Sequence, residues 1–153
     1  MGISTNTRLI GIAIIINGEL QEYKVRLHKS PWSPEKATEI ITALEPCVRQ
    51  YCIKRVVLSI PPAHCRTDEF LYLIDRLKQF FKQEQIEVIS EASTALHVFI
   101  KEHTRKTKKK VMRALVERFP ELNWYYLKEM RNKNKYYIKL FEAVGMAALY
   151  EQG

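Results

Sequence analysis

The lysines and arginines of one segment, 101–139, are the residues of this chain best placed to do chemistry. The segment holds 13 Lys and Arg against 4 Asp and Glu, a local charge of +9, whereas the remainder holds 12 against 13. Charge gathered in this way is the electrostatic footprint of a surface that binds a polyanion. We therefore predict that the segment neutralises phosphates of DNA or RNA. The predicted contacts are Arg105, Lys106, Lys108, Lys109, Lys110 and Arg113.

Aromatic side chains are interleaved with this basic charge. Unpaired bases could stack on them, as they do on the aromatic platforms of single-strand-binding proteins. Aromatics at helical spacing, however, pack more often in a core or in a dimer interface. Both interpretations stay open for Trp124, Tyr125, Tyr126, Tyr136 and Tyr137.

Length and composition predict a single cytoplasmic domain over residues 1–153. The chain is 46% hydrophobic and 27% charged, which is typical of a globular protein. It has no apolar run long enough to span a membrane and no signal-peptide pattern at its N-terminus. The three cysteines, Cys47, Cys52 and Cys65, lack metal-ligand spacing and are predicted to be reduced thiols.

Two strands and a tight turn must position the start of this chain. Residues 9–16 are almost entirely apolar, which predicts a strand buried on both faces. Residues 19–27 alternate polar and apolar, as expected nearer an edge of a sheet. Asn17-Gly18 between them is the strongest short-range hairpin signal, because both turn residues need positive φ.

The rest of the chain predicts alternating helices and strands. Strands are expected at 55–60 and 86–90, and helices at 34–48, 67–81, 108–118, 122–130 and 136–150. Ser93 or Thr94 is expected to cap a further brief helix, and Pro46 to bend or interrupt the first one. This order predicts an α/β fold with a mixed sheet and helices on both faces.

Several motifs, taken in order, resemble the RuvC family of Holliday-junction resolvases in the ribonuclease-H-like superfamily. Residues 2–11 are similar to the family opening Gly-Ile-Asp-Pro-Gly, 17–20 to its first hairpin turn, and 57–62 to a strand that ends in Ile-Glu. Residues 107–111 resemble a Ser-Lys-x-x-Val helix start, and 141–147 the final helix. The resemblance implies a ribonuclease-H-like mixed five-stranded sheet, a homodimer, and four carboxylates that hold two Mg²⁺ or Mn²⁺ ions for phosphodiester cleavage.

Carried over residue by residue, the resemblance places a carboxylate at only one of the four ligand positions. Ser4 and Ser59 stand at the first two, and a neutral hydroxyl is a poor substitute for a carboxylate. Lys139 and Glu142 stand at the last two, three residues apart and so on one helix face. Arg66 falls where the family contacts the junction. The resemblance therefore implies a site that has lost its metals.

The favoured hypothesis is a nucleic-acid-binding RuvC-like domain that is catalytically degenerate and needs no cofactor. The first alternative is a divergent structure-specific endonuclease in which Asp68, Glu69 or Glu91 supplies displaced carboxylates to Mg²⁺ or Mn²⁺. Asp68 and Glu69 also suit the first turn of a helix, and Glu91 a solvent-facing strand end. The second alternative is a dimeric scaffold whose basic face binds an acidic protein partner.

Overall fold

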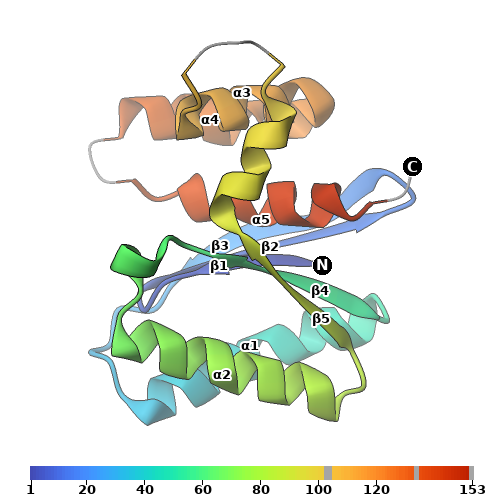
Figure 1. The fold of residues 1–153 in the computed structure, drawn as a ribbon. Coiled ribbons are helices and arrows are strands. Elements are labelled where there is room, and N and C mark those ends of the chain that lie inside the picture. The colour runs from blue at the N-terminus through green and yellow to red at the C-terminus, as the bar shows by residue number, and fades with distance from the viewer. Residues whose placement is uncertain (102–104, 133–134, 152–153) are drawn as a thin grey trace.

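A mixed five-stranded sheet forms the centre of the computed structural model, which describes residues 1–101, 105–132 and 135–151 (Figure 1). The strands are β1 (Gly2–Thr5), β2 (Leu9–Ile16), β3 (Glu19–Leu27), β4 (Arg55–Ile60) and β5 (Glu87–Ala92), in the order β3-β2-β1-β4-β5. The first three strands pair antiparallel, and β1, β4 and β5 pair parallel. The predicted mixed sheet is therefore confirmed.

The hairpin between β2 and β3 forms as its turn residues predict. Asn17 has φ 54° and Gly18 has φ 79°, the left-handed values that a tight hairpin of this kind requires. β2 has apolar side chains buried on both faces, and β3 lies at the edge of the sheet with its polar face outward. The alternation in the sequence thus predicted which strand is internal and which lies at the edge.

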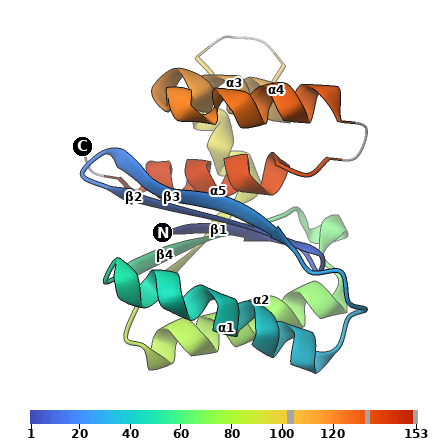
Figure 2. The same ribbon diagram turned by 180° about the vertical axis from the view of Figure 1, so that it is seen from behind.

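Helices cover both faces of the sheet in unequal layers (Figures 1 and 2). One face carries α1 (Pro34–Gln50) and α2 (Asp68–Gln83), which share an apolar cluster with the sheet. The other face carries α5 (Ile138–Leu149), and α3 (Lys108–Arg118) and α4 (Asn123–Arg131) stack on α5. Short 3₁₀ turns at η1 (Ala63–Cys65), η2 (Ser93–Phe99) and η3 (Pro120–Leu122) connect these elements.

Side-chain caps begin three of the helices. Ser33 accepts a hydrogen bond from the backbone N–H three residues later at 3.2 Å, and so begins α1. Thr67 does the same for α2 at 3.1 Å, and Thr107 for α3 at 3.2 Å. Each oxygen satisfies a backbone donor that the first turn of a helix leaves unpaired. The starts of these helices were predictable from short polar residues before an apolar period.

Two local predictions were wrong. Neither Ser93 nor Thr94 caps a helix, because η2 follows Ala92 without a side-chain cap and is 3₁₀ rather than α. Pro46 does not interrupt α1, which continues past it to Gln50.

Two glycines allow α5 to lie directly on the sheet. A Cβ at Gly11 of β2 would stand 2.1 Å from the carbonyl oxygen of Lys139, and one at Gly2 of β1 would stand 2.0 Å from that of Ala143. Side chains cannot occupy such space, so only glycine permits this approach. The close packing brings the first turn of α5 against β1 and β2.

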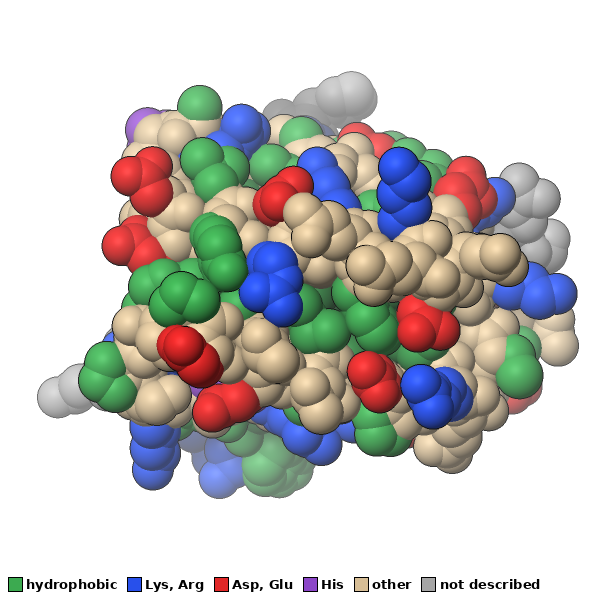
Figure 3. Space-filling view, turned by 90° about the horizontal axis from the view of Figure 1, so that it is seen from below, with side chains coloured by type: hydrophobic (Ala, Val, Ile, Leu, Met, Phe, Trp, Pro, Cys, Tyr) green, Lys and Arg blue, Asp and Glu red, His purple; other side chains and the backbone are tan. Residues whose placement is uncertain are grey.

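Charge divides the two helical layers. On the outer face of α1 and α2, Lys and Arg are interspersed with Asp and Glu (Figure 3). In the opposite layer, α3 alone carries five Lys or Arg and one Glu in its eleven residues. The fold therefore concentrates positive charge on one side of the sheet.

Within the described ranges, no helix is long and apolar enough to cross a membrane.

Candidate functional site

The serines at positions 4 and 59 lie on neighbouring strands. β1 pairs parallel with β4 through Gly2–Val57 and Ile3–Leu58, and the next step of this register sets Ser4 beside Ser59. Adjacent strands are about 4.8 Å apart. Both serines are buried, and alternation along the strands turns them to the face covered by α5. The two positions are therefore adjacent beneath α5.

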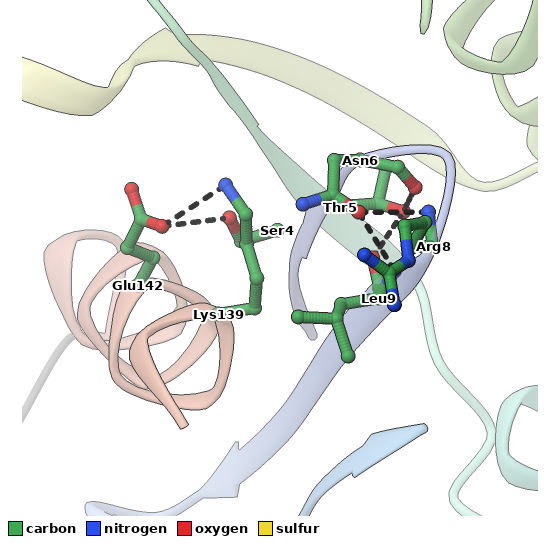
Figure 4. Close-up of polar contacts among 7 residues, drawn as sticks. All are labelled: Ser4, Thr5, Asn6, Arg8, Leu9, Lys139 and Glu142. Atoms are coloured by element: carbon green, nitrogen blue, oxygen red, sulfur yellow. Dashed lines mark hydrogen bonds and ion pairs between the residues drawn. The ribbon is translucent and has the colours of Figure 1, made fainter. Parts of the chain in front are cut away.

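The first turns of α5 complete this group. Glu142 accepts a hydrogen bond from Ser4 Oγ at 3.4 Å, and the same oxygen, Oε1, lies 3.2 Å from Lys139 Nζ (Figure 4). The side chains of Lys139 and Glu142 are only 17% and 11% exposed. The structure thus brings together Ser4, Lys139 and Glu142 in direct contact, with Ser59 on the adjoining strand.

The turn between β1 and β2 is fixed by its own side chains (Figure 4). Asn6 Oδ1 accepts from the backbone N–H of Arg8 at 2.8 Å and of Leu9 at 2.7 Å, while Thr5 Oγ1 donates to Leu9 O at 3.0 Å. An asparagine that bonds backbone donors two and three residues on forms an Asx-type turn. This role of Asn6 was not predicted from the sequence, although an Asn followed by short polar residues between two strands was the available signal.

A cavity of about 520 Å³ opens beside this group, beyond the ends of β1 and β4. Its apolar wall is formed by Phe70, Leu96, Val111, Met112, Ile138 and Phe141. Its charged lining comes from Lys108, Lys139 and Glu142, and Asn6 of the fixed turn also faces it. We call this cavity the cleft.

Arg66 lies at the edge of the cleft. Its Nε donates to the carbonyl oxygen of Pro61 at 2.9 Å, and Pro61 is one of the lining residues. The guanidinium is exposed on the loop that joins β4 to α2. Arg66 therefore occupies a place from which it could contact a nucleic acid that enters the cleft.

The predicted phosphate contacts are distributed around α3. Lys108 lines the cleft, whereas Lys110 and Arg113 line a second hollow of about 590 Å³ together with Lys101 and Arg118. Arg105, Lys106 and Lys109 are exposed near the start of the helix. The described part of the basic segment thus presents positive charge on two sides of α3, and residues 102–104 and 133–134 of the segment lie outside the described ranges.

The aromatic residues divide between packing and exposure. Tyr125 stands edge-on to Tyr23 and to Tyr137, with ring centroids 5.8 and 5.2 Å apart, and burial raises the pKa of Tyr137. Trp124 is 55% exposed, and Lys128 Nζ lies 5.2 Å from its ring centre. The packing interpretation therefore applies to Tyr125 and Tyr137, while Trp124 keeps a face that a base could stack on.

The donor set of the cleft does not fit a divalent cation. Mg²⁺ and Mn²⁺ prefer carboxylate and carbonyl oxygens, and Glu142 is the sole carboxylate among the four positions carried over from the family. The ammonium of Lys139 occupies space beside that carboxylate. Within the described residues, no group of three or more His, Cys, Asp or Glu is arranged to hold a metal ion.

The displaced carboxylates lie apart from this group. Glu91 pairs in register with Ser59 on the neighbouring strand, but its carboxylate accepts a hydrogen bond from the Tyr150 hydroxyl and thereby raises the pKa of that tyrosine. Glu91 therefore does not face solvent freely as the sequence predicted. Asp68 and Glu69 are exposed in the first turn of α2, as that interpretation expected.

Solved structures share this fold, although no family model and no curated protein sequence matches the chain. RuvC of Thermus thermophilus in complex with a Holliday junction substrate has a TM-score of 0.71 at 11% identity, over 95% of this chain and 87% of that one. Another structure of T. thermophilus RuvC gives 0.69 at 11% identity, over 97% and 92% of the two chains. The Fowlpox virus resolvase, in complex with its Holliday junction DNA, gives 0.56 at 14% identity over 97% and 95%. The chain therefore has the RuvC-like, ribonuclease-H-like fold that the sequence predicted.

Proposed function

We propose that this chain is a catalytically degenerate RuvC-like domain that binds branched DNA. The observation that carries the proposal is the contact of Lys139 Nζ with Glu142 Oε1 at 3.2 Å, next to the buried hydroxyl of Ser4. A lysine ammonium stands where the fold's nucleases are expected to need a cation held by several carboxylates. The cleft retains positive charge to attract a phosphate and lacks the ligands to activate water with a metal.

The fold likeness and the electrostatics support DNA as the ligand. Both resolvase complexes named above contain Holliday junction DNA, and each matches more than nine-tenths of this chain. Lys108 and Lys139 line the cleft, Arg66 lies at its edge, and α3 adds further cations along one side. Such contacts bind the phosphate backbone without reading bases, so shape rather than sequence selects the ligand.

Fluorescence anisotropy with a labelled four-way DNA junction tests the proposal. We expect binding at 50 mM salt that weakens steeply by 200 mM, because each phosphate contact to duplex DNA contributes a slope of about −0.9 in log K against log salt. Duplexes and an RNA junction of the same sequence serve as comparison ligands. Lys108→Ala combined with Lys109→Ala should lower the slope by about 2, whereas Lys78→Ala with Lys82→Ala on the opposite layer should not.

A cleavage assay tests the loss of catalysis. Incubation of the junction with the protein and 5 to 10 mM Mg²⁺ or Mn²⁺ should leave every strand intact on a denaturing gel. Metal-dependent nicking that Glu142→Ala or Glu91→Ala abolishes would establish the divergent endonuclease instead. Absence of binding to any of these nucleic acids at low salt would leave the scaffold with an acidic protein partner. The homodimer stays a prediction, which light scattering of the same preparation measures.

A further inference from the structure

Lys139 occupies a position that is unfavourable for a lysine. It is the second residue of α5, where the helix macrodipole places positive partial charge. Its side chain is 17% exposed, so water screens that charge only weakly. A cation at this end of a helix therefore needs a negative partner nearby, and Glu142 one turn later supplies it.

The ion pair with Glu142 uses only one of the three hydrogen-bond donors of the Lys139 ammonium. A lysine Nζ carries three hydrogens, and within the described part of the chain one hydrogen bond is formed, to Glu142 Oε1. Lys139 and Lys108 both line the cleft, and the single acidic side chain lining it is Glu142. The described charges around the cleft therefore sum to a positive value, although the fold's nucleases are expected to be acidic there.

We propose that the Lys139 ammonium binds a phosphodiester oxygen of DNA directly, in the place where divalent cations would otherwise contact the phosphate. The inference rests on the proposed function, because it assumes that DNA enters this cleft. Glu142 positions the ammonium through the ion pair, and the remaining hydrogens of Nζ are donated to the phosphate. Charge-assisted hydrogen bonds of this kind are the stronger class in proteins.

Substitutions at the two members of the pair have opposite effects if this assignment is right. Lys139→Met keeps the aliphatic stem but removes the donor, so we expect the junction to bind about tenfold more weakly, the loss of one charge-assisted hydrogen bond. Glu142→Gln keeps an Oε1 acceptor that can still hold the ammonium in place, but it removes the negative charge that repels the phosphate and competes for Nζ, so we expect tighter binding. A purely structural ion pair predicts that both substitutions weaken binding equally, through loss of the fold.

The test measures affinity for the labelled four-way junction by anisotropy in EDTA and in Mg²⁺ at equal ionic strength. Far-ultraviolet circular dichroism and thermal melting establish that each variant is folded. Lys139→Arg, which preserves charge and donors, is expected to retain wild-type affinity. Lys78→Ala on the exposed surface of α2 is the matched control for loss of one positive charge. Affinity of the unmodified protein should be the same in EDTA and in Mg²⁺.

The outcomes separate this inference from the proposed function. If the unmodified protein does not bind the junction at low salt, the proposed function itself fails. If it binds, but Lys139→Met behaves like Lys78→Ala, only the phosphate contact is refuted. Equal weakening by Lys139→Met and Glu142→Gln, or binding that requires Mg²⁺, refutes it as well. Opposite shifts with unchanged affinity in EDTA establish it.

Discussion

Introducing carboxylates at three positions of the cleft should create a divalent metal site. The variant carries Ser4→Asp, Ser59→Asp and Lys139→Asp and keeps Glu142. The strand register sets positions 4 and 59 side by side, and Glu142 already contacts Ser4 at 3.4 Å. Four carboxylate groups within such a space match the oxygen-ligand preference of Mn²⁺. We expect the variant to bind Mn²⁺ and the unmodified protein not to.

The expected change in the stability of the variant follows from the charges that it introduces. Replacing the Lys139–Glu142 attraction at 3.2 Å by a pair of carboxylates introduces a repulsion of about 3 kcal/mol, taking about 5 Å and an effective dielectric constant of about 20. The metal-free variant should therefore be less stable. Mn²⁺ at about 100 times its dissociation constant raises the free energy of unfolding of the variant by about 2.7 kcal/mol. In a domain of this size that corresponds to a rise in Tm of about 5–10 °C.

Thermal unfolding in EDTA and in MnCl₂, followed by circular dichroism, measures this rise, and titration calorimetry measures the binding. The control variant carries Ser30→Asp, Lys78→Asp and Ser90→Asp, which make the same charge change at exposed positions. It should show no specific rise in Tm with Mn²⁺. A cleft variant that is folded in EDTA but has the same Tm in Mn²⁺ would refute the correspondence between these positions and the family's ligands.

Substitutions at three further positions test packing and electrostatics elsewhere in the fold. Gly11→Ala should destabilise the protein by about 2 kcal/mol or more in urea denaturation, because its Cβ would lie 2.1 Å from Lys139 O; an unchanged midpoint would contradict the close approach of α5. Glu129→Ala should cost about 2–3 kcal/mol in the same assay, since the buried carboxylate accepts from the backbone N–H of Tyr136 and Tyr137 just before α5, while Glu129→Gln should cost less. Burial, Lys36 and Arg26 lower the pKa of His28. As the pH falls below about 6.5, His28 is therefore protonated in the unfolded state before it is protonated in the folded state. The free energy of unfolding should decrease as the pH is lowered through this range. His28→Gln should flatten that part of a stability–pH profile, and an identical profile would show that another group is responsible.

Local patterns predicted most of the fold, because those patterns act over a few residues. The Asn17-Gly18 turn formed as predicted, with positive φ at both residues. The helices predicted at 67–81 and 108–118 begin close to the predicted positions, at side-chain caps that depend on backbone donors within three residues. Predictions failed where contacts outside the local sequence determine the backbone conformation. Pro46 lies inside α1, which continues past it. The 3₁₀ turn at η2 likewise replaced a predicted capped helix.

The candidate site was predictable only in part, because its contacts join distant segments. Spacing alone set Lys139 and Glu142 on one helix face, and the resemblance added Ser4 and Ser59. Nothing local indicated that Gly11 must be a glycine, because its neighbour is a helix more than a hundred residues later. The cleft and its apolar wall were not predictable for the same reason, since α2, α3 and α5 each contribute a side.

The ion pair gives a reason for a glutamate in a cleft that does not fit a metal. With serines at positions 4 and 59, Glu142 alone is too poor a ligand set for Mg²⁺. Lys139, however, is largely buried at the positive end of α5, and loss of Glu142 would leave that ammonium without its ion-pair partner at substantial cost. The two residues therefore depend on each other, and a change at either one alone is unfavourable. Glu142 thus has a structural reason to pair with Lys139 that requires no metal, and its carboxylate is not by itself a sign of metal-dependent catalysis.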